Sequence, residues 1–407
     1  MTNSPHSTRA EERYSPRQIT PKARAMPFLS QGFRPFFLIA AIWAAVSMTL
    51  WITYWAGGIA LPGPLLPVDW HSHELIFGYG GAVLCGFLLT AIPNWTKRPP
   101  LSGAPLAGLA ALWLAARIGF LFDTGLPFGA LVALDLSFPV LFSAFAGREI
   151  IAGGNRRNLP VFGIVVLFLL ANILFYWEVS TGAALYGPRL GIAVLIGLIC
   201  LIGGRIIPAF TRNWLKSRGA TDLPAEFGAL DKAVLAGTIA GLALWVVLPQ
   251  QWVTGLAGLT LGAAHLARMA RWRGMATRRE PLLFALHLGY GFVALGFVLA
   301  GLAAILPSVP PMAAIHGWTV GAIGTMTLTV MTRATLGHSG RALAAGWVET
   351  VFLAALPLAA LARIASTFPA SPVWMLHLSA NLWILGFGLF ALRFAPVMFR
   401  PKPGAQA

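Results

Sequence analysis

Apolar runs long enough to cross a bilayer dominate this chain of 407 residues. A helix that spans the hydrocarbon core needs about 20 mostly apolar residues. The runs are too long for β-barrel strands and lack the two-residue alternation of such strands. The sequence therefore predicts an all-α polytopic membrane protein with twelve transmembrane helices. Their approximate limits are 36–57, 70–93, 105–121, 127–147, 159–178, 185–207, 229–248, 250–270, 281–306, 311–335, 344–364 and 372–395.

The distribution of basic residues predicts how these helices are oriented. Charged residues make up only 10% of the chain, whereas soluble domains carry about 25%. The net charge is nevertheless +16, because lysines and arginines fill the N-terminal segment and the segments that follow every second run. The positive-inside rule places these segments, and both chain termini, in the cytoplasm. The positive charge therefore reports membrane topology, and no nucleic-acid partner is expected.

The ends of the chain are predicted to be tails around one membrane domain. Residues 1–34 form a basic cytoplasmic segment without the apolar core of a signal peptide, and we expect this segment to be disordered. Residues 35–396 form a single twelve-helix domain, and 397–407 form a second cytoplasmic tail.

Three arginines depart from the loop pattern. Arg117, Arg189 and Arg363 lie towards the outer ends of the third, sixth and eleventh runs. A charge within the membrane is costly and normally has a partner. One interpretation is that they reach the outer interface or pair with Asp123 or Glu178. The other is that they hold an anionic ligand such as the propionates of haem.

Other polar residues occur in the middle of the runs. Asp135 and Asn172 either make a hydrogen bond between helices or form part of a path for protons or substrate. Cys85 and Cys200 are the only two cysteines and also lie mid-run, where a disulfide has no evident role. We predict that both cysteines are packing residues.

The histidines fall into two levels of the predicted membrane domain, apart from His6 in the tail. Neutral imidazole is a common ligand of haem iron and copper, and a buried histidine is otherwise a hydrogen-bonded structural residue. Met312, four residues before His316, offers a thioether for copper, although packing is its more common role. The outer level comprises His71, His73, His316 and His377, and the inner level comprises His265, His287 and His338.

Helical geometry limits which of these residues can act together. His71 and Glu74 are three residues apart and are expected to share a helix face. His73 lies about 200° from His71 around a helix, so the two either serve different partners or belong to a non-helical segment. His316 and His338 are separated by about 33 Å if the helix is continuous. An outer and an inner site are therefore predicted.

A weak repeat relates the second, sixth and tenth runs. They end in IPNWTK (92–97), IPAFTR (207–212) and MTR (331–333), which are four runs apart each time. This spacing favours a 4+4+4 pseudo-threefold arrangement, as in the catalytic subunit of haem-copper oxidases. The alternative is a 6+6 division with 208–228 as the central loop, as in major-facilitator transporters.

Four stretches together resemble the NnrS family of bacterial inner-membrane proteins. They begin WHSHELIFGYGG (from 70), GGRIIPAFTRNWL (from 203), LHLGYGFVALG (from 286) and HGWTVGAIGTMT (from 316). The resemblance implies a multi-pass inner-membrane protein that contains haem and copper and is associated with nitric oxide and denitrification. Carried over to this chain, the characteristic histidines are His71, His73, His287, His316 and His338, with Glu74 and Arg333 beside them.

These considerations define the predicted sites. We expect the five characteristic histidines to bind cofactor. The predicted metal-binding residues are His71, His73, Glu74, His316 and His377. The expected partners are the lipid bilayer and nitric oxide as a small-molecule ligand.

The functional hypothesis is that this chain is a membrane protein that binds haem and copper. It would act in the nitric oxide response and in nitrosative-stress resistance. The alternatives are a secondary transporter that relays protons through histidines, and a haem-based sensor or assembly partner without turnover. No catalytic residue is predicted, because the sixth and seventh runs lack the histidines of an oxidase copper site and a resemblance does not establish a reaction.

Overall fold

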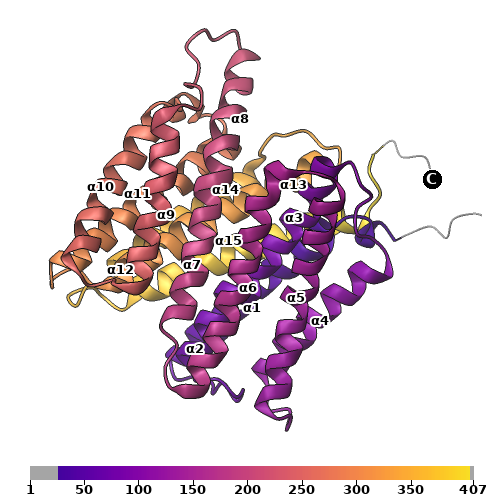
Figure 1. Cartoon of the computed structure of the whole chain (residues 1–407), viewed down its shortest axis with the longest axis vertical. Helices are drawn as coiled ribbons and strands as arrows, with labels where there is room; N and C mark the ends of the chain where they lie inside the picture. Colours follow the sequence, from indigo (N-terminus) through magenta and orange to yellow (C-terminus); the bar gives the residue numbers. More distant parts are fainter. Residues whose placement is uncertain (1–25, 404–407) are drawn as a thin grey trace, which may run out of the picture.

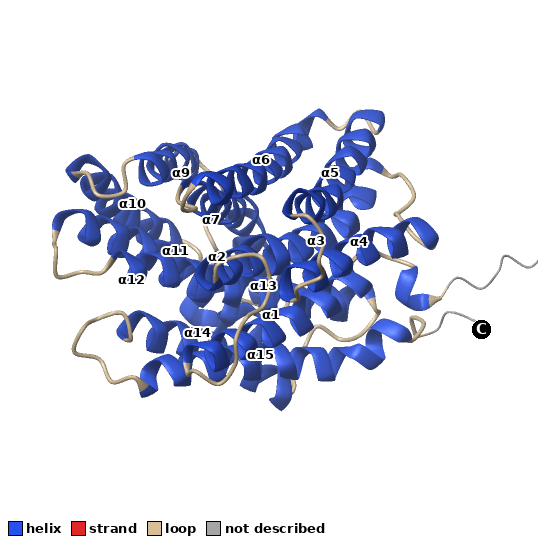
Figure 2. Cartoon of the chain, turned by 90° about the horizontal axis from the view of Figure 1, so that it is seen from below, coloured by secondary structure: helices blue, strands red, loops and turns tan. Residues whose placement is uncertain are grey.

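The chain folds into twelve long helices, and no strand occurs within residues 26–403, the part that the computed structural model describes (Figure 2). Three of the twelve are continuous units in which a π-helical segment joins two α-helices. In chain order the helices are α1 (Phe33–Trp55), α2–η2–α3 (Pro67–His73, Glu74–Tyr79, Gly80–Thr96), α4 (Ala104–Leu121), α5 (Phe128–Ala152), α6 (Leu159–Thr181), α7–η4–α8 (Tyr186–Leu198, Ile199–Gly203, Gly204–Lys216), α9 (Ala229–Val247), α10 (Trp252–Ala270), α11 (Pro281–Ile305), α12–η6–α13 (Pro311–His316, Gly317–Gly324, Thr325–His338), α14 (Trp347–Ala365) and α15 (Trp374–Phe399).

The twelve predicted runs correspond one to one with these helices. Ten of the helices are long and apolar enough to cross a membrane. The other two, α10 and the unit α12–η6–α13, have similar lengths but are less apolar. The chain is therefore a polytopic α-helical membrane protein.

One predicted boundary is wrong. The sixth helix does not end near residue 207, because α8 continues to Lys216 through part of the predicted loop 208–228. Ile207, Thr211 and Leu215 are buried at a spacing of four residues. One face of α8 therefore packs against the bundle and supports the helix beyond Pro208, even though proline removes a backbone hydrogen bond.

The three units with π-helical segments form the centre of the bundle (Figure 1). The segment α7 contacts both η2 and η6, and α13 contacts α3, so each unit touches the other two. They are the second, sixth and tenth helices, and a π-helical segment lies within each. The structure thus repeats every four helices, which matches the 4+4+4 division and not the 6+6 division.

The ordered domain begins and ends outside its predicted limits of 35 and 396. A short 3₁₀-helix, η1 (Pro27–Leu29), precedes α1, and α15 continues to Phe399. The buried Arg34 guanidinium donates hydrogen bonds to the carbonyl oxygens of Met398 (2.7 Å) and Arg400 (2.8 Å). The two ends of the domain are therefore joined. The prediction of disorder for 1–25, and the part of the predicted C-terminal tail at 404–407, lie outside the described residues.

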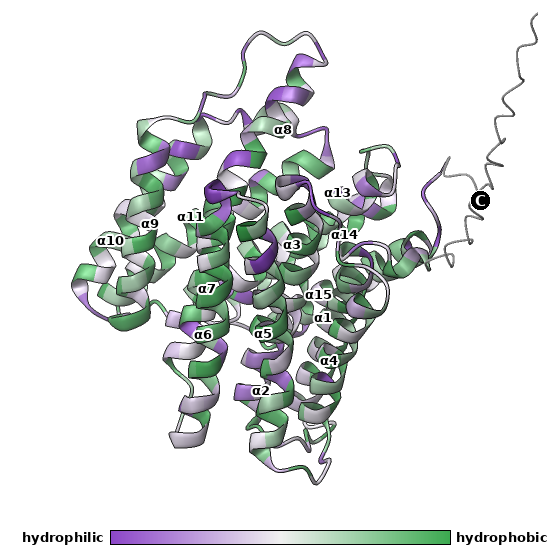
Figure 3. Cartoon of the chain, turned by 45° about the vertical axis from the view of Figure 1, so that its right-hand side comes forward, coloured by the Kyte–Doolittle hydropathy of each residue, from purple (hydrophilic) through white to green (hydrophobic). Residues whose placement is uncertain are grey.

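Hydrophilic residues gather at one end of the bundle, beside α8, and the residues along the helices are largely apolar (Figure 3). We call it the basic end, because the segments rich in lysine and arginine follow the C-terminal ends of α3, α8 and α13. The three central units all run towards it. Their N-terminal halves form the outer half of the bundle, on the side that the positive-inside rule predicts to face away from the cytoplasm.

Candidate functional site

A cavity of about 290 Å³ lies in the outer half of the bundle, and we call it the outer pocket. The three central units and the helices α1, α14 and α15 form its wall. Most of the wall is aliphatic, which suits an apolar ligand held by a few polar groups. The wall residues on which the following argument depends are Trp51, His71, Tyr79, Arg189, Met312, His316, Arg363 and Trp383.

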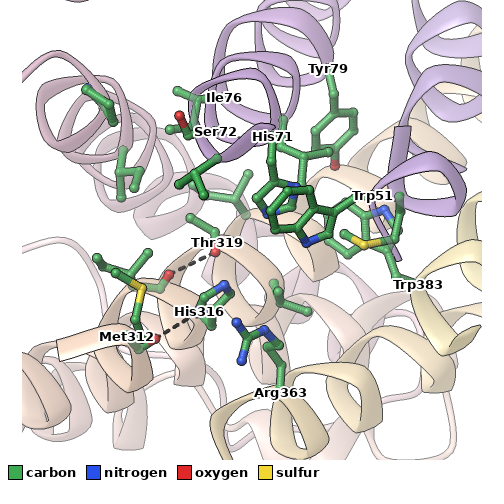
Figure 4. A pocket seen from close by; sticks show the side chains of 18 of the residues that line it. Trp51, His71, Ser72, Ile76, Tyr79, Met312, His316, Thr319, Arg363 and Trp383 are labelled. Atoms are coloured by element: carbon green, nitrogen blue, oxygen red, sulfur yellow. Dashed lines mark hydrogen bonds between the residues drawn. The ribbon is translucent and has the colours of Figure 1, made fainter. Parts of the chain in front are cut away.

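His316 is oriented for ligand binding by its own helix. The residue ends α12, and its Nδ1 lies 2.8 Å from the carbonyl oxygen of Met312, one turn earlier (Figure 4). A carbonyl oxygen only accepts hydrogen bonds, so Nδ1 carries the proton. The lone pair of the neutral ring is then on Nε2, which is the arrangement found in many metal-binding histidines. The thioether of Met312 also lines the pocket.

His71 enters the same pocket from α2 and is held by stacking. Its ring lies 4.2 Å from the ring of Trp51, centroid to centroid, at an angle of 15°. Neither ring nitrogen of His71 has a hydrogen-bond partner within residues 26–403. Figure 4 shows His71 and His316 directed into the same space, with Arg363 beside His316. The structure therefore brings together two of the predicted outer histidines.

Two of the three exceptional arginines face this pocket. Arg189 at the start of α7 and Arg363 near the end of α14 are half-buried wall residues. Arg363 donates a hydrogen bond to the Ser366 hydroxyl at 3.0 Å. Neither arginine has a carboxylate within 4 Å among the described residues. Two guanidinium groups thus remain available to an anionic part of a ligand.

His73 and Glu74 belong to a different group of side chains, which we call the ionic cluster. It joins α2, η2, α4, α5 and α6, and every member is buried. Its members are His73, Glu74, Arg117, Asp135, Asn172 and Tyr176.

Arg117 is the centre of the ionic cluster. Its guanidinium pairs with the Asp135 carboxylate and lies 3.1 Å from Oε2 of Glu74. That Glu74 oxygen also accepts a hydrogen bond of 2.7 Å from the indole of Trp43. The predicted partners of Arg117, Asp123 and Glu178, are wrong for this residue. Glu178 instead accepts hydrogen bonds from the backbone that begins α7.

Both ring nitrogens of His73 are occupied within the cluster. Nδ1 lies 3.0 Å from Oε1 of Glu74, and Nε2 lies 3.1 Å from Oδ1 of Asn172 and 2.9 Å from the hydroxyl of Tyr176. Asn172 also donates to Asp135 at 2.9 Å, which confirms the predicted contact between helices. His73 therefore has no free nitrogen for a metal in this arrangement.

His71 and Glu74, which were expected to share a helix face, reach different groups of side chains. Positions three residues apart differ by about 60° around a helix. Several helices pack around the helical turn that carries both residues. A difference of about 60° therefore directs His71 into the outer pocket and Glu74 into the ionic cluster. His71 and His73 are helical and serve different partners, which was one of the two predicted alternatives.

The remaining histidines do not join the outer pocket. His377 in α15 is half-buried and absent from the pocket wall. His265 is buried between the hydroxyls of Thr238 (3.0 Å) and Tyr290 (3.1 Å). His338 is exposed at the end of α13, next to the ring of Phe33.

His287 lines a second cavity near the basic end, of about 590 Å³, together with Met269 and Met275. Its Nε2 lies 2.9 Å from the hydroxyl of Thr211. Its Nδ1 packs closely against Gly274. A Cβ added to Gly274 would lie only 2.7 Å from this Nδ1. We call this the inner cavity.

The described residues contain no cluster of three or more histidine, cysteine or acidic side chains suited to a metal ion. The predicted metal set of His71, His73, Glu74, His316 and His377 is therefore distributed over separate places. Sequence reasoning also missed the aromatic walls of the outer pocket, Trp51, Tyr79 and Trp383. In the sequence nothing distinguishes these residues from aromatic residues that face lipid.

The family model described as NnrS protein matches residues 27–402, which is nearly the whole chain. No curated protein matches.

Proposed function

Because this chain belongs to the NnrS family, whose members are membrane proteins of the nitric oxide response, we propose that it binds haem and copper in the bacterial inner membrane. In this proposal it binds nitric oxide and contributes to nitrosative-stress resistance linked to denitrification. The observation that carries the proposal is the outer pocket, in which two histidines and two arginines without a carboxylate partner meet on a mostly apolar wall.

The number of histidines in the outer pocket suits haem better than a lone copper ion. A haem brings four nitrogen ligands of its own, so the protein supplies only one or two axial ligands. His71 and His316 supply that number, whereas the one acid of the wall, Asp69, forms no metal-binding group of three with them among the described residues. The pocket volume of about 290 Å³ lies just below the usual range for ligand pockets, about 300–1,000 Å³.

The residues around the two histidines would hold the cofactor in one orientation. His316 presents Nε2 because Nδ1 is bonded to Met312. Trp51 stacks on His71 and limits its rotation. Arg189 and Arg363 would bind carboxylate groups of the macrocycle at its outer edge. When bound, a haem iron held by one of the two histidines would supply a coordination site for a diatomic molecule.

Copper is better placed in the inner cavity. Thioether sulfur and imidazole nitrogen are donors that Cu(I) accepts, and Met269, Met275 and His287 line this one cavity. Thr211 holds the His287 ring in position through Nε2. This leaves Nδ1 as the ring nitrogen that would bind the ion.

The haem proposal is tested by purifying the protein and recording its optical spectrum and haem content. We expect His71→Ala and His316→Ala each to reduce bound haem, because each removes a pocket histidine. The matched control is His377→Ala, which changes a histidine on the same level that does not reach the pocket. A protein without haem, or equal haem in all three variants, would overturn the proposal.

Exposure of the reduced protein to nitric oxide then separates the functional alternatives. Spectral change with catalytic loss of nitric oxide indicates turnover, and spectral change alone indicates a sensor. Substrate flux in proteoliposomes without bound pigment indicates a transporter. Metal analysis of His287→Ala tests the copper site separately, with His338→Ala as the control. Unchanged copper in His287→Ala would contradict the inner-cavity assignment.

A further inference from the structure

Another cavity, apolar and separate from the inner cavity, lies between the three central units, and we call it the axial cavity. Its volume is about 80 Å³, and its wall consists entirely of residues from α3, α7–η4–α8 and η6–α13. Leu195 of α7 and Ile323 of η6 line both the axial cavity and the outer pocket. Only these two side chains belong to both walls, so they form the boundary between the two spaces.

The wall of the axial cavity has no polar group available to a ligand. Thr327 is its one polar side chain within the described residues. The Thr327 hydroxyl is paired with the hydroxyl of Tyr79 and donates to the carbonyl oxygen of Ile323 at 2.7 Å. A charged or hydrated molecule would lose its hydrogen bonds with water and gain none here, which costs several kcal/mol. The cavity therefore selects uncharged, weakly hydrated molecules.

The volume restricts the ligand further. A water molecule occupies about 30 Å³ in the liquid, so about two or three diatomic molecules fill this space. A haem or a bulky organic substrate is too large for this volume.

The axial cavity is closed towards the outer pocket and more open towards the basic end. Leu195 and Ile323 are buried, whereas Phe87, Ile206 and Val330 at the other end of the wall are half-buried. All three half-buried side chains are apolar, so this side of the cavity suits entry by small uncharged molecules from apolar surroundings.

We propose that the axial cavity binds small uncharged diatomic molecules and delivers them from the membrane interior to the outer pocket, with Leu195 and Ile323 as the constriction. Delivery to the outer pocket rests on the proposed function, in which nitric oxide is the ligand of that pocket. The cavity as a gas-binding site does not depend on that proposal.

Xenon is a suitable first probe because it binds in small apolar cavities. We expect crystals of the full chain under xenon pressure to show xenon between the three central units. Ile202→Phe should remove it, because Ile202 lines the axial cavity and not the outer pocket. The matched control is Ile384→Phe in α15, a half-buried position that lines neither space. Xenon found only elsewhere, or retained in Ile202→Phe, would overturn the binding site.

The second measurement is the rate of carbon monoxide association with the reduced, haem-containing protein after flash photolysis. We expect Ile202→Phe to slow association about tenfold, equivalent to about 1.4 kcal/mol in the barrier. Haem content and equilibrium affinity should match those of Ile384→Phe. An unchanged rate in Ile202→Phe, with the cavity filled, would overturn delivery by this route. Absence of haem would overturn the proposed function instead, while bound xenon would still support the cavity.

Discussion

Replacing Arg117 by methionine is expected to destabilise the protein strongly, because Arg117 is the buried cation between two buried carboxylates. Glu74 and Asp135 both contact its guanidinium, and the three residues are at most 4% exposed. Methionine fills a similar volume without the charge, so the main effect is the loss of compensation for the two acids.

The expected magnitude follows from the burial of the pair. Removing one partner of a buried ion pair costs about 3–5 kcal/mol, since the remaining charge is left uncompensated. The ratio of folded to unfolded protein should therefore fall by roughly two to nearly four powers of ten, since about 1.4 kcal/mol is tenfold. The double variant Arg117→Met with Asp135→Asn removes one charge of each sign. It should be more stable than Arg117→Met alone.

Unfolding in mixed micelles with increasing SDS, followed by circular dichroism, measures these free energies. The matched control is Arg363→Met, because Arg363 is half-buried and its one hydrogen bond to a side chain is with Ser366. Loss of a single hydrogen bond costs about 0.5–1.5 kcal/mol. Equal stability of the two single variants, or no recovery in the double variant, would refute the role of charge compensation in the ionic cluster.

Two further predictions concern packing. Arg34→Ala should cost about 1–3 kcal/mol, because it leaves buried carbonyl groups without a donor. Faster hydrogen exchange at the end of α15 would show this, and unchanged exchange would contradict it. Gly301→Leu should destabilise by at least about 1–3 kcal/mol, since a Cβ there would lie 2.7 Å from the carbonyl oxygen of Gly255 and α10 would have to move. Gly388→Leu, where the space is open, is the control in the same SDS titration, and equal effects would argue against close helix packing.

The membrane fold could be predicted because each helix is encoded locally. Every apolar run became a helix, and the repeated endings at 92–97, 207–212 and 331–333 correctly related the three central units. The wrong prediction of where the sixth helix ends, at α8, has a local cause as well. The basic residues there resemble a loop in composition, whereas the buried face of Ile207 and Thr211 continues the helix.

The sites were less predictable because their partners are distant in the sequence. Glu74 accepts a hydrogen bond from Trp43, which lies 31 positions earlier in the sequence. Asn172 contacts His73, which lies 99 positions earlier. Helical periodicity relates residues within one helix and contains no information on which faces of two helices meet. Sequence reasoning could therefore identify Arg117 as exceptional without identifying its two carboxylate partners.

The π-helical segments make the outer half of each central unit sensitive to chain length. One residue added to or removed from a helix rotates everything beyond it by about 100°. The segments η2, η4 and η6 each have more residues per turn than an α-helix. Each segment joins the half of its unit that lines the outer pocket to the half that packs towards the basic end. A one-residue deletion in η6 would therefore act as a rotation of α12, turning His316 out of the pocket while α13 keeps its packing. Insertions and deletions, more than substitutions, are the sequence changes by which such a pocket would gain or lose its histidines.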